Sequence, residues 1–296
     1  MTKIAYIMGE YPLVSLTFIQ REIAALRDLD LDVITCAMRR TPVSQHKGPA
    51  EKQAAATTYY VLENLKRPAT FLAAQKALFQ QFGAYFRTLR LAWSTRSPGF
   101  KAALYQLIYF FEATLLARHM KAEGVTHMHA HFTTGAASVA MLTSELTGIP
   151  YSFTLHGPAD FLEPYRWKIG EKAARARFVA TISHYARSQL MFHTPAEHWE
   201  RLHIIHCGVD PDRYAGQSAA TPNETRLIFV GRIAPVKGLR LLIEAMNALA
   251  DDLPDLKLTI VGDGEDRSLI EDMAKPLGDR ITFTGYLSQD DVCLLY

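Results

Sequence analysis

The sequence predicts an α/β protein made of two domains, each with a parallel sheet covered by helices. Segments with strand and helix patterns alternate along most of the chain, which is typical of parallel sheets in doubly wound domains. The length of 296 residues fits two domains at about 150 residues each. Hydrophobic residues make up 49% of the chain and charged residues 21%, as in ordinary globular proteins.

The first domain is expected over residues 1–214. Short runs of β-branched and aromatic residues between turn-forming residues predict strands, and apolar residues spaced three or four apart predict helices. In chain order, we expect a strand at 3–8, a helix at 17–29 with Ser15 as its candidate N-cap, a strand at 31–37, a basic helical region, a helix at 99–123, a strand at 126–131, a helix at 135–147, and strands at 150–155, 178–182 and 203–205.

A polar, turn-forming run predicts a linker at 215–225, and the second domain follows over 226–296. In this domain we expect strands at 226–231, 256–261 and 280–284, helices at 239–249 and 266–275, and a further helix from Ser288. These elements are about half of a doubly wound domain, and a sheet that stopped there would leave an unpaired edge. The sequence therefore predicts that the second domain is incomplete.

Charge and cysteine content exclude several classes of protein. The net charge is +2, whereas a protein dedicated to nucleic acid is far more basic. Cys36, Cys207 and Cys293 are widely spaced, which argues against a disulfide framework and a cysteine zinc site and fits a reducing compartment. The N-terminal apolar run is too short for an export signal, and no apolar run reaches the roughly 20 residues of a membrane span. We expect a cytoplasmic protein.

Basic and aromatic residues are interleaved in a stretch at 64–111 that contains no Asp or Glu. Phe, Leu and Trp residues recur there at helical spacing. One interpretation is a helical region that lies on an anionic membrane surface, at the inner face of the membrane. The other is that its apolar face packs on the domain and its basic face is solvated, since amphipathicity alone does not separate the two.

The loop at 231–238 is a candidate binding site. Gly231, Arg232, Lys237 and Gly238 lie between a predicted strand and a predicted helix, which is where open α/β sheets bind ligands. A helix N-terminus favours anions, and Arg232 and Lys237 add two cations. A diphosphate is the expected ligand. The alternative is an ordinary loop with two solvated bases.

Glycines end the next two predicted strands of that sheet in the same way. Gly262 and Gly264 follow the strand at 256–261, and Gly285 follows the strand at 280–284. Glycines allow tight turns and close backbone approach, although such turns are also common where no ligand binds. Together with Gly231, they predict a nucleotide site at one edge of the sheet.

In the first domain, Gly9 and His156 stand at the predicted carboxyl ends of strands. Gly9 allows close approach of the backbone, and His156 can donate to a sugar hydroxyl or a phosphate near neutral pH. His127, His129 and His131 alternate along a predicted strand and so share one face. That spacing suits zinc, but no carboxylate or cysteine follows at a ligand spacing. We therefore expect packed or cleft-lining histidines and no metal.

Several motifs occur in a specific order along nearly the whole chain. They stand at 11–12, 15–19, 129–132, 148–157, 182–183, 206–210, 229–232 with 237–238, and 261–264. As an ordered set they resemble the retaining GT-B glycosyltransferases of glycosyltransferase family 4, especially those of bacterial exopolysaccharide synthesis.

The resemblance implies two Rossmann-like domains that face each other across a cleft. It also implies transfer of a hexose, with retention, from a nucleotide-diphospho-sugar to a saccharide or lipid-linked acceptor, without a metal or other cofactor. Arg232 and Lys237 match the family's pair that neutralises the departing diphosphate, and His156 matches the histidine that contacts the donor sugar. The expected backbone contacts of the donor are Gly9, Gly231, Gly262 and Gly264.

Two departures from the family pattern qualify the expected activity. Leu16 stands where relatives usually carry Glu. The resemblance also implies a Glu–seven residues–Glu motif that holds the donor, and its expected place would follow Tyr296. We therefore expect a fragment of a longer enzyme, and the alternative is a nucleotide-sugar-binding remnant without turnover. A nicotinamide-dependent oxidoreductase is a weaker alternative, because only Gly9 stands where G-x-G-x-x-G is expected.

Overall fold

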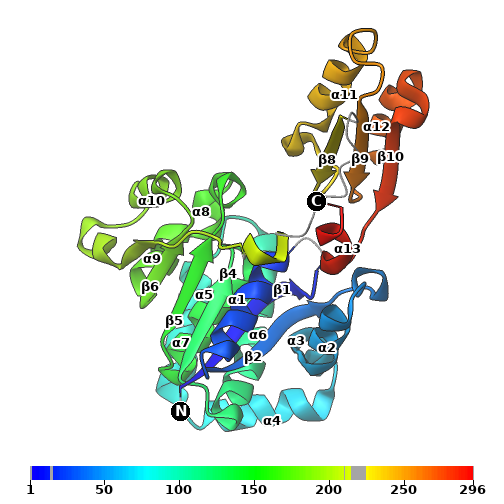
Figure 1. Cartoon of the computed structure of the whole chain (residues 1–296). Helices are drawn as coiled ribbons and strands as arrows, with labels where there is room; N and C mark the ends of the chain where they lie inside the picture. The colour runs from blue at the N-terminus through cyan, green and yellow to red at the C-terminus, as the bar shows by residue number, and fades with distance from the viewer. Residues whose placement is uncertain (1, 14–15, 210, 215–224, 296) are drawn as a thin grey trace. The chain divides into compact units, whose positions relative to one another are not determined.

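The computed structural model describes residues 2–13, 16–209, 211–214 and 225–295. The chain divides into two compact units, whose elements are labelled in Figure 1. The larger unit comprises Met1–Pro12, Phe18–Pro42 and Gln53–Gly208, and the smaller unit comprises Leu13–Thr17, Val43–Lys52 and Val209–Tyr296. Apart from Thr225, the linker predicted at 215–225 lies outside the described residues, as does the candidate N-cap Ser15.

The larger unit is built on a seven-stranded sheet in which all neighbouring strands are parallel. Its strands, in chain order, are β1 (Lys3–Tyr11), β2 (Asp32–Arg40), β3 (Tyr59–Tyr60), β4 (His127–His131), β5 (Tyr151–Leu155), β6 (Phe178–Thr181) and β7 (Leu202–Ile204). The spatial order is β3-β2-β1-β4-β5-β6-β7. The winding therefore reverses between β1 and β4, and ligands of open α/β sheets bind beyond the carboxyl ends of strands at such a point.

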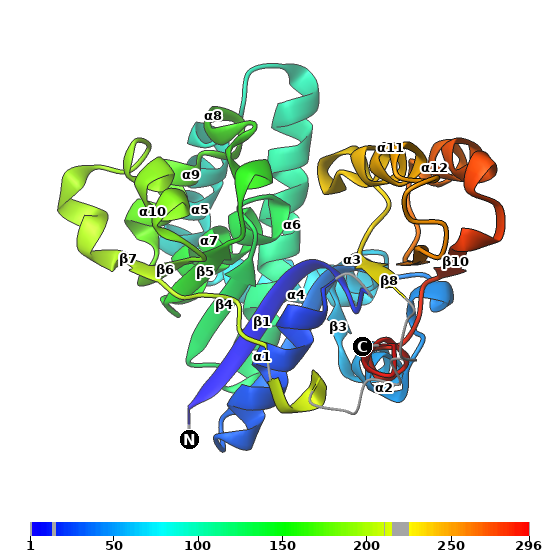
Figure 2. The same cartoon turned by 45° about the horizontal axis from the view of Figure 1, so that its top comes forward.

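Helices cover both faces of this sheet: Figures 1 and 2 show α1 on one face and α6 and α7 on the other. The α-helices that precede β7 are α1 (Thr17–Asp28), α2 (Pro49–Thr57), α3 (Val61–Leu65), α4 (Pro68–Phe79), α5 (Phe82–Ser94), α6 (Phe100–Glu123), α7 (Gly135–Thr147), α8 (Pro164–Trp167), α9 (Ile169–Arg175) and α10 (His184–Met191). β5 is buried along its whole length, because helices on both faces leave no polar side to such a strand.

The predicted strands and helices occur in the predicted order, but β1 and β2 both end three residues later than expected. β1 continues to Tyr11, because Glu10 and Tyr11 stay paired with Arg39 and Arg40 of β2. The predicted end at residue 8 is therefore wrong, and Gly9 lies inside β1 instead of in a loop after it. The short elements β3, α2 and α8 to α10 have too few residues to show a clear period in the sequence.

The basic stretch at 64–111 is divided among several helices. It begins near the end of α3, contains all of α4 and α5, and runs into the first half of α6. Pro68 starts α4, as proline often does at the first helical position, and Gly99 precedes α6 with φ +105°. Among the helices that the structure describes, none combines the length and the hydropathy needed to cross a bilayer.

The smaller unit contains a three-stranded parallel sheet in the order β10-β9-β8. Its strands are β8 (Arg226–Val230), β9 (Lys257–Val261) and β10 (Ile281–Gly285), and its α-helices after β8 are α11 (Leu239–Ala248), α12 (Arg267–Ala274) and α13 (Gln289–Cys293). Ile233, Ile243, Ile260 and Ile270 are fully buried in its core. The expected helix after Ser288 forms, and Ser288 Oγ caps it by accepting from the backbone N–H of Asp291.

Candidate functional site

Three histidines occupy β4, the strand next to the reversal of winding in the larger unit. His127, His129 and His131 alternate along β4, as predicted, and so share one face of the sheet. The two ring nitrogens of His129 lie 2.7 Å from the hydroxyl of Ser152 and 2.9 Å from that of Thr154, both on β5. This buried imidazole is thus fully hydrogen-bonded, as buried polar groups generally are.

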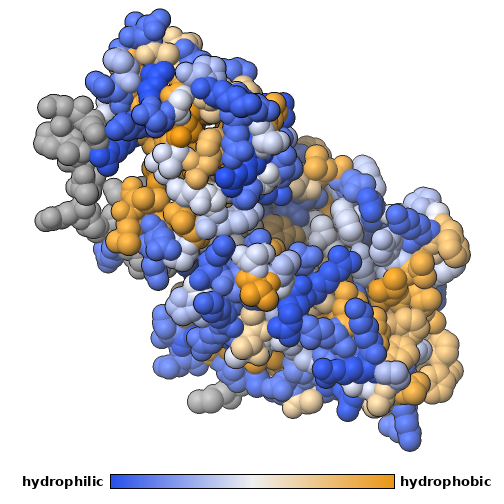
Figure 3. All heavy atoms as spheres, turned by 90° about the vertical axis from the view of Figure 1, so that its right-hand side faces the viewer, coloured by the Kyte–Doolittle hydropathy of each residue, from blue (hydrophilic) through white to orange (hydrophobic). Residues whose placement is uncertain are grey.

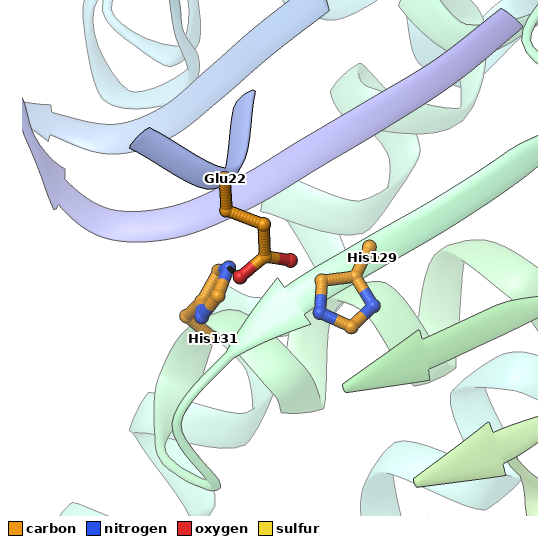
Figure 4. Close-up of side chains that lie close together, drawn as sticks. All are labelled: Glu22, His129 and His131. Carbon is orange, nitrogen blue, oxygen red and sulfur yellow. Dashed lines mark ion pairs between the residues drawn. The ribbon is translucent and has the colours of Figure 1, made fainter. Parts of the chain in front are cut away.

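His156 follows β5 directly and contacts His131 through their rings. Nε2 of His156 lies 2.8 Å from Nδ1 of His131. The other ring nitrogen of His131, Nε2, faces the carboxylate of Glu22 on α1 at 4.0 Å (Figure 4). The second oxygen of Glu22 accepts a hydrogen bond of 2.5 Å from the hydroxyl of Tyr6. A continuous line of polar groups therefore runs from β1 to the carboxyl end of β5.

His129, His131 and His156 form a histidine cluster, and burial favours the neutral form of each. It lowers the pKa of His156 to about 4 and that of His129 to about 3, and it lowers the pKa of His131 well below its ordinary value. The cause is that a buried imidazolium loses the hydration that stabilises its charge. At neutral pH each ring therefore carries one N–H donor and one lone pair.

The carboxylate of Asp160 joins the loops that follow β4 and β5. Its Oδ1 accepts hydrogen bonds from the backbone N–H and the hydroxyl of Thr133, and its Oδ2 accepts from the backbone N–H of His156. Phe132, the first residue of the loop after β4, has a φ of +67°, which L side chains rarely adopt. Its ring lies 4.8 Å from that of His156. Such backbone strain persists only where surrounding contacts impose it, often at functional sites.

Lys172 on α9 supports the same loop from inside the core. Its residue is 1% exposed, and its Nζ donates to the backbone carbonyls of Thr133 and Thr134. Burial lowers the pKa of this ammonium group to about 7. Asp160 and Lys172 therefore fix the loop after β4 from two sides, and with it the position of His131.

Glu22, His129 and His131 together form a group with the composition of a metal site. Their ligand atoms lie within 4.8 Å of one another (Figure 4). The sequence analysis expected no carboxylate near these histidines, because none follows them at a ligand spacing. That expectation is wrong, because α1 places Glu22 beside His131 from a distant part of the sequence. Both nitrogens of His129 already bond to hydroxyls, however, so the group also fits a metal-free hydrogen-bond network. The absence of a metal stays a prediction.

In the smaller unit, the loop between β8 and α11 presents two cations. β8 ends at Val230 and α11 begins at Leu239, which confirms the predicted strand, loop and helix. Arg232 and Lys237 are both exposed on this loop, and Gly238 has a φ of +72° at the start of α11. The first N–H groups of a helix lack intrahelical partners, so the loop and the helix end together favour an anion.

Gly262 and Gly264 are needed where the loop after β9 touches the loop after β8. A Cβ atom at 262 would lie 1.9 Å from the carbonyl oxygen of Gly231, and one at 264 would lie 2.2 Å from that of Ile233. The backbone N–H of Ile233 also donates to the carbonyl of Asp263 at 3.0 Å. The predicted close approach therefore exists, but it is an approach of the chain to itself. Contact of these glycines with a donor stays a prediction.

Two family models match the sequence of the chain. Residues 17–213 match the model described as Glycosyltransferase Family 4, and residues 211–296 match the model described as Glycosyl transferases group 1. The first of these matches covers more than half of the chain. The chain belongs to glycosyltransferase family 4.

Curated relatives of this family-4 chain resemble part of it. The 2-deoxystreptamine glucosyltransferase of Streptomyces kanamyceticus is 28% identical over 176 residues, which is 51% of this chain and 45% of the relative. The putative teichuronic acid biosynthesis glycosyltransferase TuaC of Bacillus subtilis is 28% identical over 158 residues, 48% of this chain and 39% of the relative. The matched part of the chain thus spans less than half the length of either relative.

Solved glycosyltransferases share the fold of the family-4 chain. A mutant of S. aureus TarM, solved with Fondaparinux, alpha-GlcNAc-glycerol and UDP, matches with a TM-score of 0.63 and 12% identity, covering 99% of this chain and 79% of that one. This likeness and the two parallel sheets show the GT-B fold of two Rossmann-like domains.

The residues predicted for the family-4 site fall into separate groups. His156 belongs to the histidine cluster of the larger unit, while Arg232 and Lys237 lie in the loops of the smaller unit with the glycines at 231, 262 and 264. Gly9 stands apart in β1, where a Cβ atom would meet no atom within 4 Å. Among the described residues, no contact explains a glycine there.

The sequence analysis did not identify four residues that support the histidine cluster of the larger unit. They are Tyr6, Glu22, Asp160 and Lys172. Asp160 leaves one local signal, since it stands four residues after His156 in a turn-forming run. The other three sit in ordinary strand and helix patterns, and their roles follow from contacts with distant segments.

Proposed function

We propose that this family-4 chain forms part of a retaining enzyme that moves a hexose from a nucleotide-diphospho-sugar to a saccharide or lipid-linked acceptor in exopolysaccharide or other cell-surface glycan synthesis. Two relatives are named for glucosyl transfer and for teichuronic acid synthesis, and the TarM complex contains UDP. The observation that carries the proposal is the pair of exposed cations, Arg232 and Lys237, in the loop that leads into α11.

The two cations act on the leaving group in this proposal. When the bond between the anomeric carbon and the diphosphate oxygen breaks, negative charge develops on the diphosphate. Arg232 can hold phosphate oxygens with two parallel hydrogen bonds, and Lys237 supplies a second positive charge. Fixed cations at the point where charge develops stabilise the transition state, and they do so without a metal ion.

His156 is proposed to contact the donor sugar. Nε2 of His156 is engaged with His131, so Nδ1 is the nitrogen that can bond to a ligand. The low pKa of His156, about 4 because of burial, keeps the ring neutral at pH 7. A neutral imidazole suits a sugar hydroxyl, which can both donate and accept a hydrogen bond.

An anionic membrane surface is the proposed location of a lipid-linked acceptor. Phe82, Phe86 and Trp93 on α5 are spaced by four and seven residues and so share one helix face. They are 59%, 43% and 58% exposed. Apolar residues also gather in patches on the face of the molecule that Figure 3 shows. The alternative, in which the apolar face packs on the domain, holds for Leu91, which is buried in the core, but it does not account for the three exposed rings. The guanidinium of Arg96 lies 3.9 Å from the ring centre of Trp93, as in interfacial helices that join aromatic and basic groups.

The alternative function is nucleotide-sugar binding without turnover. The two functions differ in whether the donor is consumed. The test incubates the 296-residue chain with uridine, guanosine and thymidine diphosphate hexoses and measures binding by calorimetry and release of free nucleoside diphosphate. Binding of a donor that is never consumed would support the alternative for this chain, and the same assay on any longer native reading frame would then decide for the whole protein.

Lys237→Ala tests the diphosphate assignment directly. We expect turnover to fall about a hundredfold, the usual effect of removing one group that stabilises a developing negative charge, while the urea midpoint stays unchanged. Lys275→Ala is the matched control, because Lys275 is exposed in the same unit and pairs with Asp272. Normal turnover in Lys237→Ala would contradict the assignment.

A further inference from the structure

The pair formed by His131 and His156 has one end that faces a carboxylate and one end that faces a thiol at a long distance, which a ligand can displace. Nε2 of His131 is fully buried and has no hydrogen-bond partner among the described residues; Oε2 of Glu22 faces it at 4.0 Å. At the opposite end, Nδ1 of His156 has a weak contact of 3.8 Å with the sulfur of Cys207. The ring of Phe18 lies 4.6 Å from that of His156 and restricts its rotation.

Two neutral imidazoles joined by one hydrogen bond have two arrangements of their protons. In the first, His131 carries its proton on Nδ1 and donates to His156, whose own proton is then on Nδ1. In the second, His131 carries its proton on Nε2, and His156 donates from Nε2 and has a lone pair on Nδ1. The arrangements give His156 opposite hydrogen-bonding character at the nitrogen that faces a ligand.

Glu22 favours the second arrangement. The hydroxyl of Tyr6 donates to Oε1 of Glu22, which leaves Oε2 as an acceptor directed at His131. A carboxylate oxygen is complemented by an N–H and is repelled by a lone pair. The side chain of His131 is 0% exposed and that of Glu22 is 41% exposed, so water reaches the carboxylate but not the imidazole, and the interaction is screened less than one between two exposed groups.

We propose that Glu22 and His131 hold His156 in the tautomer protonated on Nε2, so that its Nδ1 accepts a hydrogen bond from a hydroxyl of the bound sugar. Glu22 and His131 are positioning residues in this arrangement, and they act through His156 without touching the ligand. The assignment of a sugar hydroxyl rests on the proposed function. The tautomer itself is a property of the free chain.

The proposal is tested by nitrogen NMR of the 296-residue chain labelled with 15N-histidine. A protonated ring nitrogen and an unprotonated one differ widely in 15N chemical shift. The signals of the two rings are assigned by their loss in His156→Gln and His131→Gln. We expect Nε2 protonated and Nδ1 bare in both His156 and His131. A protonated Nδ1 on His156 would overturn the proposal.

Glu22→Gln gives a sharper prediction for the same measurement. With Tyr6 still donating to the amide oxygen, the amide N–H₂ of the variant faces Nε2 of His131 and requires a lone pair there. The proton of His131 then moves to Nδ1, and the tautomer of His156 inverts. Glu123→Gln is the matched control, because Glu123 is 40% exposed against 41% for Glu22 and pairs with Lys3; it lies near His119 and not near His131 or His156. An unchanged tautomer in Glu22→Gln would overturn the role of Glu22.

Kinetics separates this inference from the proposed function. With a donor that is turned over, we expect Glu22→Gln to lower kcat about tenfold at nearly unchanged KM, the factor for one altered hydrogen bond. If the tautomer inverts in Glu22→Gln but kcat is unchanged, the proposal that Nδ1 of His156 accepts a hydrogen bond from a sugar hydroxyl is overturned. If no donor is consumed by the wild-type chain, the proposed function fails while the NMR result still decides on the tautomer.

Discussion

At the scale of single residues, the smaller unit shows how backbone packing decides where glycine is needed. The loops after β8 and β9 approach so closely that a Cβ atom at 264 would lie 2.2 Å from the carbonyl oxygen of Ile233. At Gly231, in contrast, a Cβ atom would come no nearer than 3.5 Å to the side chain of Phe229, which is an ordinary contact distance. Two glycines in the same pair of loops therefore differ in how well they tolerate a side chain.

Gly264→Ala is expected to destabilise the smaller unit by roughly 2 kcal/mol, because the new methyl group forces apart two backbone segments. The measurement is urea unfolding followed by a signal from the smaller unit. Gly231→Ala is the control, and we expect its urea midpoint to stay within the error of the wild type. Equal midpoints for the two variants would show that the loops separate easily.

At the scale of elements, α5 has two faces with different surroundings. Thr88, Leu91 and Ala92 are buried against the larger unit, while Phe82, Phe86 and Trp93 are exposed. Phe79 at the end of α4 extends the exposed aromatic face, with its ring centre 5.6 Å from that of Phe82. A helix that exposes aromatic residues beside arginines has the composition of an interfacial helix.

Replacing Phe82, Phe86 and Trp93 together by Ser is expected to weaken binding to vesicles that contain phosphatidylglycerol. The loss should be at least tenfold, since each buried aromatic ring contributes more than 1 kcal/mol. Sedimentation with vesicles at low salt measures it. Phe192→Ser is the control, because Phe192 is 80% exposed in the same unit outside the basic stretch. Equal loss in the control, or wild-type binding in the triple variant, would refute membrane contact through α5.

At the scale of the whole molecule, the buried histidines make the stability of the larger unit depend on pH. The pKa values of His156 and His129, about 4 and about 3, lie below the unfolded value of about 6.5, and burial also depresses the pKa of His131. Between the low pKa values of the folded chain and the unfolded value of about 6.5, the unfolded chain binds more protons than the folded chain. Stability is therefore highest above pH 6.5 and falls as the pH decreases toward 4.

At pH 5, His156 and His129 are each expected to lower the free energy of unfolding by about 2 kcal/mol relative to pH 7. Urea unfolding at the two pH values measures the total decrease. His156→Gln should show a smaller decrease than the wild type, while replacement of the exposed His203 by Gln should leave it unchanged. A decrease of the same size in all three proteins would assign the pH dependence to other groups.

The sequence by itself determined most of the elements and the family. Alternation of strand and helix patterns predicted β4, β5, β8 and α11 close to their observed bounds, because local periodicity records which side of an element is buried. His156 was predicted from its place after a strand of the first sheet, and Arg232 and Lys237 from their place after a strand of the second. In each sheet, the carboxyl ends of the parallel strands lie at the same edge, where ligands bind. The family model over residues 17–213 confirms the resemblance carried by the ordered motifs.

Only the tertiary structure decided which groups surround those residues. Glu22 reaches His131 from α1, across more than a hundred positions of sequence, and no local pattern encodes such a contact. The extent of β1 was decided by pairing with β2, and the exposure of the aromatic face of α5 by which side of the helix meets the rest of the unit. Spacing in the sequence fixes the direction of side chains within one element, whereas partners from different elements depend on packing of the whole unit.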